Sequence, residues 1–183
     1  IGVADSTIHV PIRPYSFALL PETNRLVMTS APMMEDTTAD VVQVRRLSDL
    51  GLVRTLQVPP AHLPNGDIQP RGHNYPFEPR VMPDQTVLLS TYGCGFYRVT
   101  GSGGDDPQIQ NVHAIDIPSG RLGMCGVPVV VGRYWIMPVG RLNALITLDV
   151  RDPAQPREVS RLLSDSTFRP QWLARDPGSD GGG

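Results

Sequence analysis

The chain has 183 residues, a hydrophobic content of 40% and a formal net charge of −2. This length suits one ordinary domain with a sizeable core, and the balanced, scattered charge offers nucleic acid no basic face. All 16 basic residues are arginine, so Schiff bases and phosphate loops that need lysine are excluded. No apolar run approaches the roughly 18 residues of a membrane-spanning helix, so no membrane span is expected.

Short strands joined by turns are the expected local structure. Proline and glycine number 19 and 18, and alternating β-branched and aromatic runs lie between them. The expected strands, in chain order, are Ser16 to Leu20, Leu26 to Thr29, Asp40 to Arg45, Gly51 to Gln57, Arg80 to Met82, Val87 to Thr91, Gly95 to Val99, Gln110 to Asp116, Val127 to Val131, Tyr134 to Val139, Ala144 to Asp149, and Arg157 to Leu163.

A frame of fixed length recurs along the chain and sets the register of these strands. Its ends are seven residues apart at Pro14 to Pro21, Pro76 to Pro83, Cys125 to Gly132, and Pro170 to Pro177. Each frame predicts the first hairpin of a four-stranded unit. One such unit cannot bury both of its faces, so neighbouring units must stack on it.

The repeat predicts an all-β fold, a β-propeller of four-stranded blades in one domain, 1–183. The blades are expected at about 13–72, 73–122 and 123–168, with the start of a further blade at 169–180. Propellers typically have about four to eight blades, so about three blades make a partial propeller. Missing blades or a partner chain would complete the ring. The alternative is an open β-sandwich with a coincidental proline pattern.

Ligands of propellers bind around the central channel, where the loops that flank the inner strands converge. The candidate ligand-binding residues at these strands are Arg13, Tyr75, Glu78, Arg80, Arg169 and Trp172. Arg13 and Arg169 share a frame position, and two guanidinium groups at one mouth would bind a small anionic ligand. The alternatives are solvated turns or salt bridges between blades for the arginines, and packing between blades for Trp172.

A transition metal is the one cofactor that the residues suggest. His73 precedes an inner strand, and Glu78 comes five positions after His73. The imidazole nitrogen of His73 and a carboxylate oxygen of Glu78 could bind the same cation. The alternative is a loop histidine that caps backbone groups. His113 is expected on an outer strand, as a surface residue.

The two cysteines leave three interpretations open. Cys94 and Cys125 match neither a zinc spacing nor a thioredoxin motif. They are two inert thiols, one disulfide or a reactive pair. Glycines flank both positions, which indicates close backbone approach.

The stretch Asn143 to Leu163 resembles a blade segment of two propeller groups, in which a strand ending in Asp-Val is followed by an Asp-Pro-x-x-Pro turn and the outermost strand. One group is the LVIVD repeat family. The other is the selenium-binding protein family, to which 75–92 and 169–173 also bear similarity. That family includes metal-dependent thiol oxidases with histidine ligands, although its histidine-rich and paired-cysteine motifs are not present here. Relatives with such repeats are often exported, so the resemblance favours a periplasmic or extracellular location.

The predicted function is a non-catalytic propeller module that binds a ligand or a protein partner on its loop face. The first alternative is an enzyme of the metal-dependent thiol-oxidase type, with His73 as one ligand. The second is a purely structural role in assembly.

Overall fold

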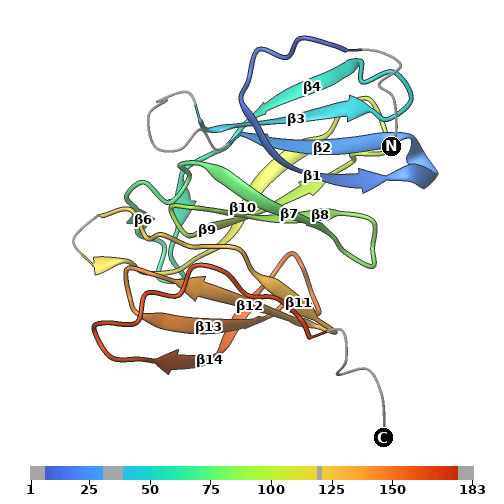
Figure 1. Cartoon of the computed structure of the whole chain (residues 1–183). Helices are drawn as coiled ribbons and strands as arrows, with labels where there is room; N and C mark the ends of the chain where they lie inside the picture. Colours follow the sequence, from blue (N-terminus) through green and yellow to red (C-terminus); the bar gives the residue numbers. More distant parts are fainter. Residues whose placement is uncertain (1–6, 31–38, 119–120, 177–183) are drawn as a thin grey trace, which may run out of the picture.

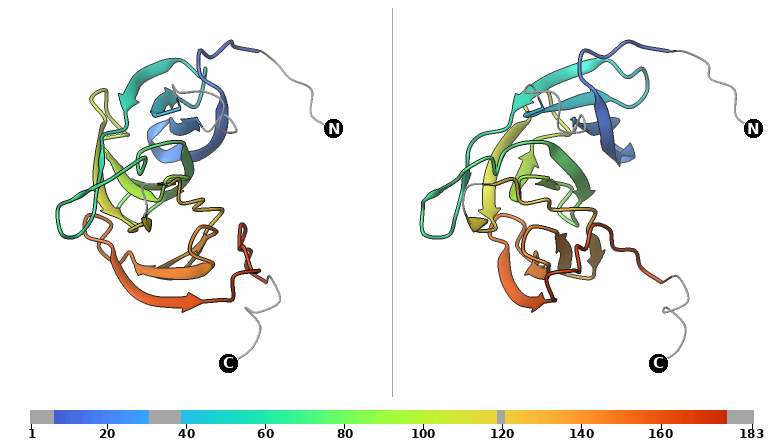
Figure 2. Two further views of the ribbon diagram at one scale, coloured as in Figure 1. Left: turned by 90° about the vertical axis from the view of Figure 1, so that its left-hand side faces the viewer. Right: turned by 60° about the vertical axis from the view of Figure 1, so that its left-hand side comes forward.

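The computed structural model describes residues 7–30, 39–118 and 121–176. Within them, three four-stranded antiparallel sheets follow one another in sequence order, which Figure 1 shows from blue to orange. The further views in Figure 2 keep this order. A 3-10 turn, η1 (Pro21–Thr23), follows β1, and no helix among the described residues is long and apolar enough to cross a membrane.

Each sheet is built from four strands consecutive in sequence, as the repeat predicts. We call the sheets blades 1, 2 and 3. Blade 1 contains β1 (Pro14–Leu20), β2 (Arg25–Ser30), β3 (Val41–Arg46) and β4 (Leu52–Gln57). Blade 2 contains β7 (Pro76–Val81), β8 (Val87–Thr91), β9 (Gly95–Thr100) and β10 (Gln108–Ala114). Blade 3 contains β11 (Val129–Val131), β12 (Tyr134–Val139), β13 (Ala144–Asp149) and β14 (Arg157–Leu163).

The sequence misplaced the limits of several strands. β7 begins at Pro76 and not at Arg80, because proline is tolerated on an edge strand and the register shifts between Pro76 and Pro79. The strand expected from Val127 is shorter, since Val127 forms a parallel bridge to Trp172 instead. A small hairpin of β5 (Ala61–His62) and β6 (Ile68–Gln69), which the sequence did not predict, lies in the connection between blades 1 and 2.

The core lies between the blades, because each sheet turns alternate side chains towards its neighbour. Between blades 2 and 3, Trp135 and Met137 of β12 and Ile146 of β13 are fully buried in one cluster with Phe96 of β9. Trp135 is the largest fully buried side chain of this core. A second cluster joins blade 1 to Leu89 and other residues of blade 2.

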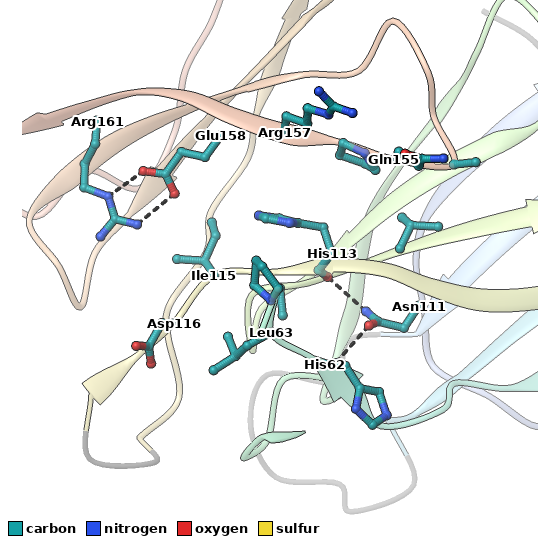
Figure 3. A pocket seen from close by; sticks show the side chains of 15 residues that line it. His62, Leu63, Asn111, His113, Ile115, Asp116, Gln155, Arg157, Glu158 and Arg161 are labelled. Atoms are coloured by element: carbon teal, nitrogen blue, oxygen red, sulfur yellow. Dashed lines mark hydrogen bonds and ion pairs between the residues drawn. The ribbon is translucent and has the colours of Figure 1, made fainter. Parts of the chain in front are cut away.

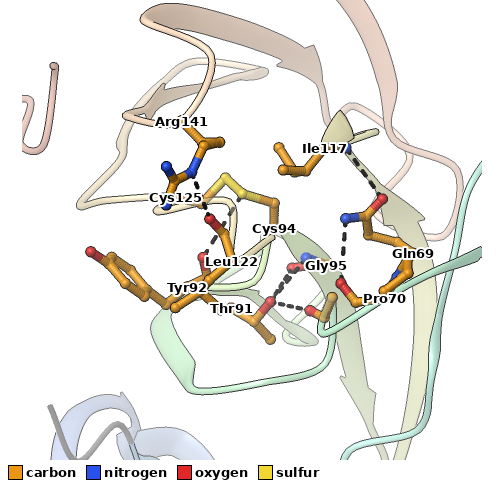
Figure 4. The surroundings of a disulfide bond; sticks show 11 residues. Gln69, Pro70, Thr91, Tyr92, Cys94, Gly95, Ile117, Leu122, Cys125 and Arg141 are labelled. Carbon is orange, nitrogen blue, oxygen red and sulfur yellow. Dashed lines mark hydrogen bonds between the residues drawn. A yellow bond between two sulfur atoms is a disulfide. The ribbon is translucent and has the colours of Figure 1, made fainter. Parts of the chain in front are cut away.

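A disulfide between Cys94 and Cys125 joins blades 2 and 3 (Figure 4). Cys94 lies in the turn between β8 and β9, and Cys125 precedes β11; both are fully buried. Gly123 has no room for a side chain, since an added Cβ would meet Cys94 Sγ at 2.2 Å. Of the three interpretations of the cysteines, the structure has the disulfide.

Ion pairs join the outer parts of blades 1 and 2. The tip of the β9–β10 hairpin carries Asp105, which pairs with Arg25 at 3.1 Å, and Asp106, which pairs with Arg54 of β4. Tyr97 of β9 also donates a hydrogen bond to the carbonyl of Pro59 at 2.9 Å. These contacts fix blade 1 against blade 2.

Candidate ligand site on the inner strands

A cleft of about 440 Å³ opens along the innermost strands of the blades. We call it the inner cleft. Four segments that are far apart in the sequence contribute its lining, together with the turn after β8. The lining residues are Tyr15, Phe77, Glu78, Tyr92, Gly126, Val127, Gln171 and Trp172.

The repeated frame explains why these residues meet. Tyr15, Phe77, Gly126 and Gln171 each come one position after the first residue of a frame. The last segment is held by two backbone hydrogen bonds with Val127, whose amide donates to the Gln171 carbonyl at 2.9 Å and whose carbonyl accepts from the Leu173 amide at 3.1 Å. Equivalent positions of successive repeats therefore line one surface.

Aromatic rings form one wall of the inner cleft. Tyr15 of β1 stacks on Phe77 of β7 with ring centroids 4.2 Å apart, and Tyr92 lies 5.7 Å from Phe77 in a tilted arrangement. Trp172 is 73% exposed. The rings offer flat apolar faces beside phenol and indole groups that can donate hydrogen bonds.

A buried carboxylate lies beside these rings. Glu78 is only 7% exposed, and its Oε2 accepts a hydrogen bond from Nη1 of Arg80 at 2.9 Å. Burial, together with the negative charge of Glu78, raises the pKa of Tyr15, and burial also raises the pKa of Tyr92. Both phenols therefore remain protonated donors at neutral pH.

The residues selected from sequence fall into three groups in the structure. Glu78 and Trp172 line the inner cleft, and Arg80 pairs with Glu78 beside it. Tyr75 is buried in a small cluster with Ala39 and Leu122. Arg13 and Arg169 are exposed and precede frame residues without lining the inner cleft.

Several residues that line the inner cleft were not selected from sequence, because most of the candidates were taken from positions at or before the residue that opens each frame. The first two positions after the frame start supply seven of the eight lining residues. The missed residues are Tyr15, Phe77, Tyr92, Gly126, Val127 and Gln171. The aromatic pairs Pro14-Tyr15 and Pro76-Phe77 were the available signal.

The two histidines singled out from sequence lie in different settings. His73 lies in a turn, half-buried, and its Nδ1 is buried with no hydrogen-bond partner in the described residues. Within these same residues, no group of three or more His, Cys, Asp or Glu side chains could hold a metal ion. His113 does lie on the outer strand β10, but it is half-buried against Phe96 and is not a surface residue.

Solved structures share this arrangement of sheets at low sequence identity. A hypothetical selenium-binding protein from Sulfolobus tokodaii matches with a TM-score of 0.62 and 9% identity, over 85% of this chain and 39% of its own. A periplasmic gluconolactonase from Pseudomonas aeruginosa matches with a TM-score of 0.57 and 19% identity, over 82% of this chain and 40% of its own. A protein from Lactobacillus plantarum matches with a TM-score of 0.58 and 13% identity, over 82% of this chain and 42% of its own.

The chain is a partial β-propeller. It spans about two fifths of the length of these solved structures, which agrees with the prediction of about three blades. No family model matches the chain. No curated protein matches it either, so its similarity to the LVIVD repeat remains a resemblance of turn and strand sequence.

Proposed function

We propose that the chain is a non-catalytic propeller module whose inner cleft binds a small hydroxylated ligand, a sugar or a sugar acid. The observation that carries this proposal is the aromatic wall of Tyr15, Phe77 and Trp172 beside the buried carboxylate of Glu78. Flat aromatic faces suit the apolar face of a sugar ring, and a few convergent polar groups fix its orientation.

The charges around the cleft favour a neutral or anionic ligand over a cation. Arg80 neutralises Glu78 through their ion pair, so the carboxylate acts mainly as a hydrogen-bond acceptor for hydroxyl groups. Arg13 and Arg169 adjoin the cleft in sequence, and their guanidinium groups suit a ligand carboxylate. The similarity to a gluconolactonase supports gluconate as a first probe.

Tryptophan fluorescence tests this proposal directly, because the chain has only two tryptophans. Trp135 is fully buried and Trp172 is 73% exposed in the cleft, so a ligand-induced emission change reports on Trp172. We expect gluconate or glucose to change the emission saturably, and Trp172→Phe to abolish the change. By calorimetry, Glu78→Gln should weaken binding about tenfold to a hundredfold, because a hydrogen bond to a charged group contributes roughly 1.5 to 3 kcal/mol.

Phe168→Leu is the matched control, since Phe168 is an exposed aromatic residue outside the cleft; its binding should equal that of the wild type. A saturable response to tetramethylammonium, with none to gluconate or glucose, would show that the aromatic wall serves a cationic ligand and would overturn the proposal.

The competing function is an enzyme of the metal-dependent thiol-oxidase type. The unpartnered Nδ1 of His73 is the observation that favours it. The other ligands would come from blades outside this chain. Elemental analysis of the longest available form of the protein decides between the two: a stoichiometric transition metal that is lost in His73→Gln would establish the metal enzyme.

We propose that further four-stranded blades cover the outer face of blade 3, supplied by a longer polypeptide or a partner chain. Cross-strand pairs place Val131 beside Tyr134, and Leu145 beside Leu162, on the face opposite to the buried Trp135. Leu162 is 63% exposed there. The bridge from Val127 to Trp172 begins an innermost strand beside this face, so a new blade would repeat the existing packing.

The 183-residue chain alone should therefore self-associate, because a second copy is the only source of such a sheet. Light scattering after gel filtration should show a mass that rises with concentration, and Leu162→Glu should reduce it. Ile68 of the β5–β6 hairpin is an apolar residue with an exposure similar to that of Leu162, and Ile68→Glu should leave the mass unchanged. A strictly monomeric wild-type chain at all concentrations would refute the need for a covering blade.

The disulfide supports a location for the protein. Buried disulfides form and persist in oxidising compartments, and the Cys94–Cys125 bond is fully buried. We therefore propose a periplasmic or extracellular location.

A further inference from the structure

Arg141 lies close to the inner cleft without lining it. It belongs to the turn between β12 and β13 and is exposed. Its Nε donates a hydrogen bond to the backbone carbonyl of Leu122 at 3.4 Å, and Leu122 belongs to the small buried cluster against which Tyr92, a lining residue of the cleft, packs. Figure 4 shows the side chains of Arg141 and Tyr92 on the same side of the disulfide. The guanidinium of Arg141 is therefore placed at the Tyr92 end of the cleft.

Backbone contacts hold the turn that carries Arg141 against segments that form the cleft. The amide of Gly140 donates a hydrogen bond to the carbonyl of Met124 at 3.0 Å. A Cβ added at Gly140 would lie 3.5 Å from the carbonyl oxygen of Pro170, and Pro170 directly precedes the lining residue Gln171. The position of the Arg141 backbone is therefore fixed by the same segments that shape the cleft.

The positive charge of Arg141 is not neutralised by a carboxylate of the chain. Arg141 takes part in none of the ion pairs that join residues of 7–30, 39–118 and 121–176. Its hydrogen bond to Leu122 uses Nε, which leaves the two terminal nitrogens to a ligand. Burial raises the pKa of Tyr92, and the charge of Arg141 opposes that rise. The guanidinium thus acts electrostatically on a phenol inside the cleft.

Two other arginines beside hollows of the molecule are already paired. A larger hollow of about 730 Å³ between β10 and β14 contains Arg161, and Figure 3 shows its guanidinium bonded to both carboxylate oxygens of Glu158. Arg80, beside the inner cleft, is paired with Glu78. A ligand carboxylate would have to displace an acidic side chain at these two arginines, whereas at Arg141 it would meet an uncompensated charge.

We propose that Arg141 binds the carboxylate of the ligand in the inner cleft and makes the cleft selective for sugar acids over neutral sugars. This inference rests on the proposed function of the cleft and narrows its ligand class. The carboxylate accepts two parallel hydrogen bonds from the terminal nitrogens of Arg141, and the phenol of Tyr92 donates a third. The hydroxyl groups of the ligand then meet Glu78 and the aromatic wall.

Glucuronate and glucose are the matched probes, because they share one ring and differ in a carboxylate. By calorimetry, the wild type should bind glucuronate at least about tenfold more tightly than glucose, since a charge-assisted contact is gained. Arg141→Gln should remove this preference and leave the affinity for glucose unchanged, and Arg141→Lys should restore part of the affinity for glucuronate. Arg133→Gln is the control, because Arg133 is an exposed arginine at the other end of β12; both affinities should stay as in the wild type.

The possible results separate this inference from the proposed function. Binding of neither sugar to the wild type would refute both. Wild-type affinity of Arg141→Gln for glucuronate, or an equal loss for glucuronate and glucose, would overturn the role of Arg141 while the cleft remained a sugar site. A loss of the preference in Arg169→Gln and not in Arg141→Gln would place the carboxylate at Arg169 and would overturn it as well.

Discussion

Replacing both cysteines with alanine is expected to lower the free energy of unfolding by about 3 to 4 kcal/mol. The Cys94–Cys125 bond closes a loop with a sequence separation of 31 residues, and a crosslink of that length restricts the unfolded chain by about this amount in the loop-entropy treatment. Alanine is preferred to serine because both positions are fully buried and a hydroxyl there would need a partner.

Urea unfolding of the wild type and of the Cys94→Ala, Cys125→Ala double variant measures the difference. Reductant should destabilise the wild type by a similar amount and leave the double variant unchanged, which separates the crosslink from the loss of sulfur packing. A wild-type stability that does not respond to reductant, after chemical proof that the bond is broken, would contradict the expected role of the disulfide.

The same bond should influence the inner cleft. Tyr92 comes two residues before Cys94, and Gly126 comes directly after Cys125. The amide of Cys125 also donates a hydrogen bond to the Tyr92 carbonyl at 3.1 Å. The disulfide therefore holds two sides of the cleft together, and the double variant should bind gluconate more weakly than the wild type under conditions where both are folded.

The sequence predicted the sheets well because their signal is local and repeated. Each frame predicts the first hairpin of a blade, and β1–β2, β7–β8 and β11–β12 are antiparallel hairpins in the structure. Strand limits were less predictable. The ends of β7 and β11 depend on a register shift at Pro76 to Pro79 and on the bridge from Val127 to Trp172, which are properties of distant pairing.

Only two of the eight residues that line the inner cleft were selected from sequence. Glu78 and Trp172 were selected, but Tyr92 was not, because it lies in the turn after β8, outside the repeated frame. The prediction that His113 is a surface residue was also wrong, because His113 packs against Phe96 of the adjacent strand. Frame position identifies which residues are equivalent, and packing between blades decides which of them face a ligand.

Gly126 provides the sharpest test of how the inner cleft is built. An added Cβ would lie 1.9 Å from the carbonyl oxygen of Gln171 and 2.7 Å from its carbonyl carbon. These are backbone atoms, so the 171–173 segment must move when the side chain is introduced. Gly126→Ala should therefore break the hydrogen bonds of Val127 with Gln171 and Leu173.

We expect Gly126→Ala to lose about tenfold or more in affinity for gluconate, because Gln171 and Trp172 leave the wall of the cleft. The Leu173 amide should exchange hydrogen faster, while amides of β12 and β13 keep their protection. Gly104→Ala is the control: an added Cβ there has its nearest neighbour at 3.6 Å, an ordinary contact. Wild-type affinity together with an unchanged Leu173 amide in Gly126→Ala would mean that the close approach of these two segments does not position the ligand, and the cleft would then have to be explained by blades 1 and 2 alone.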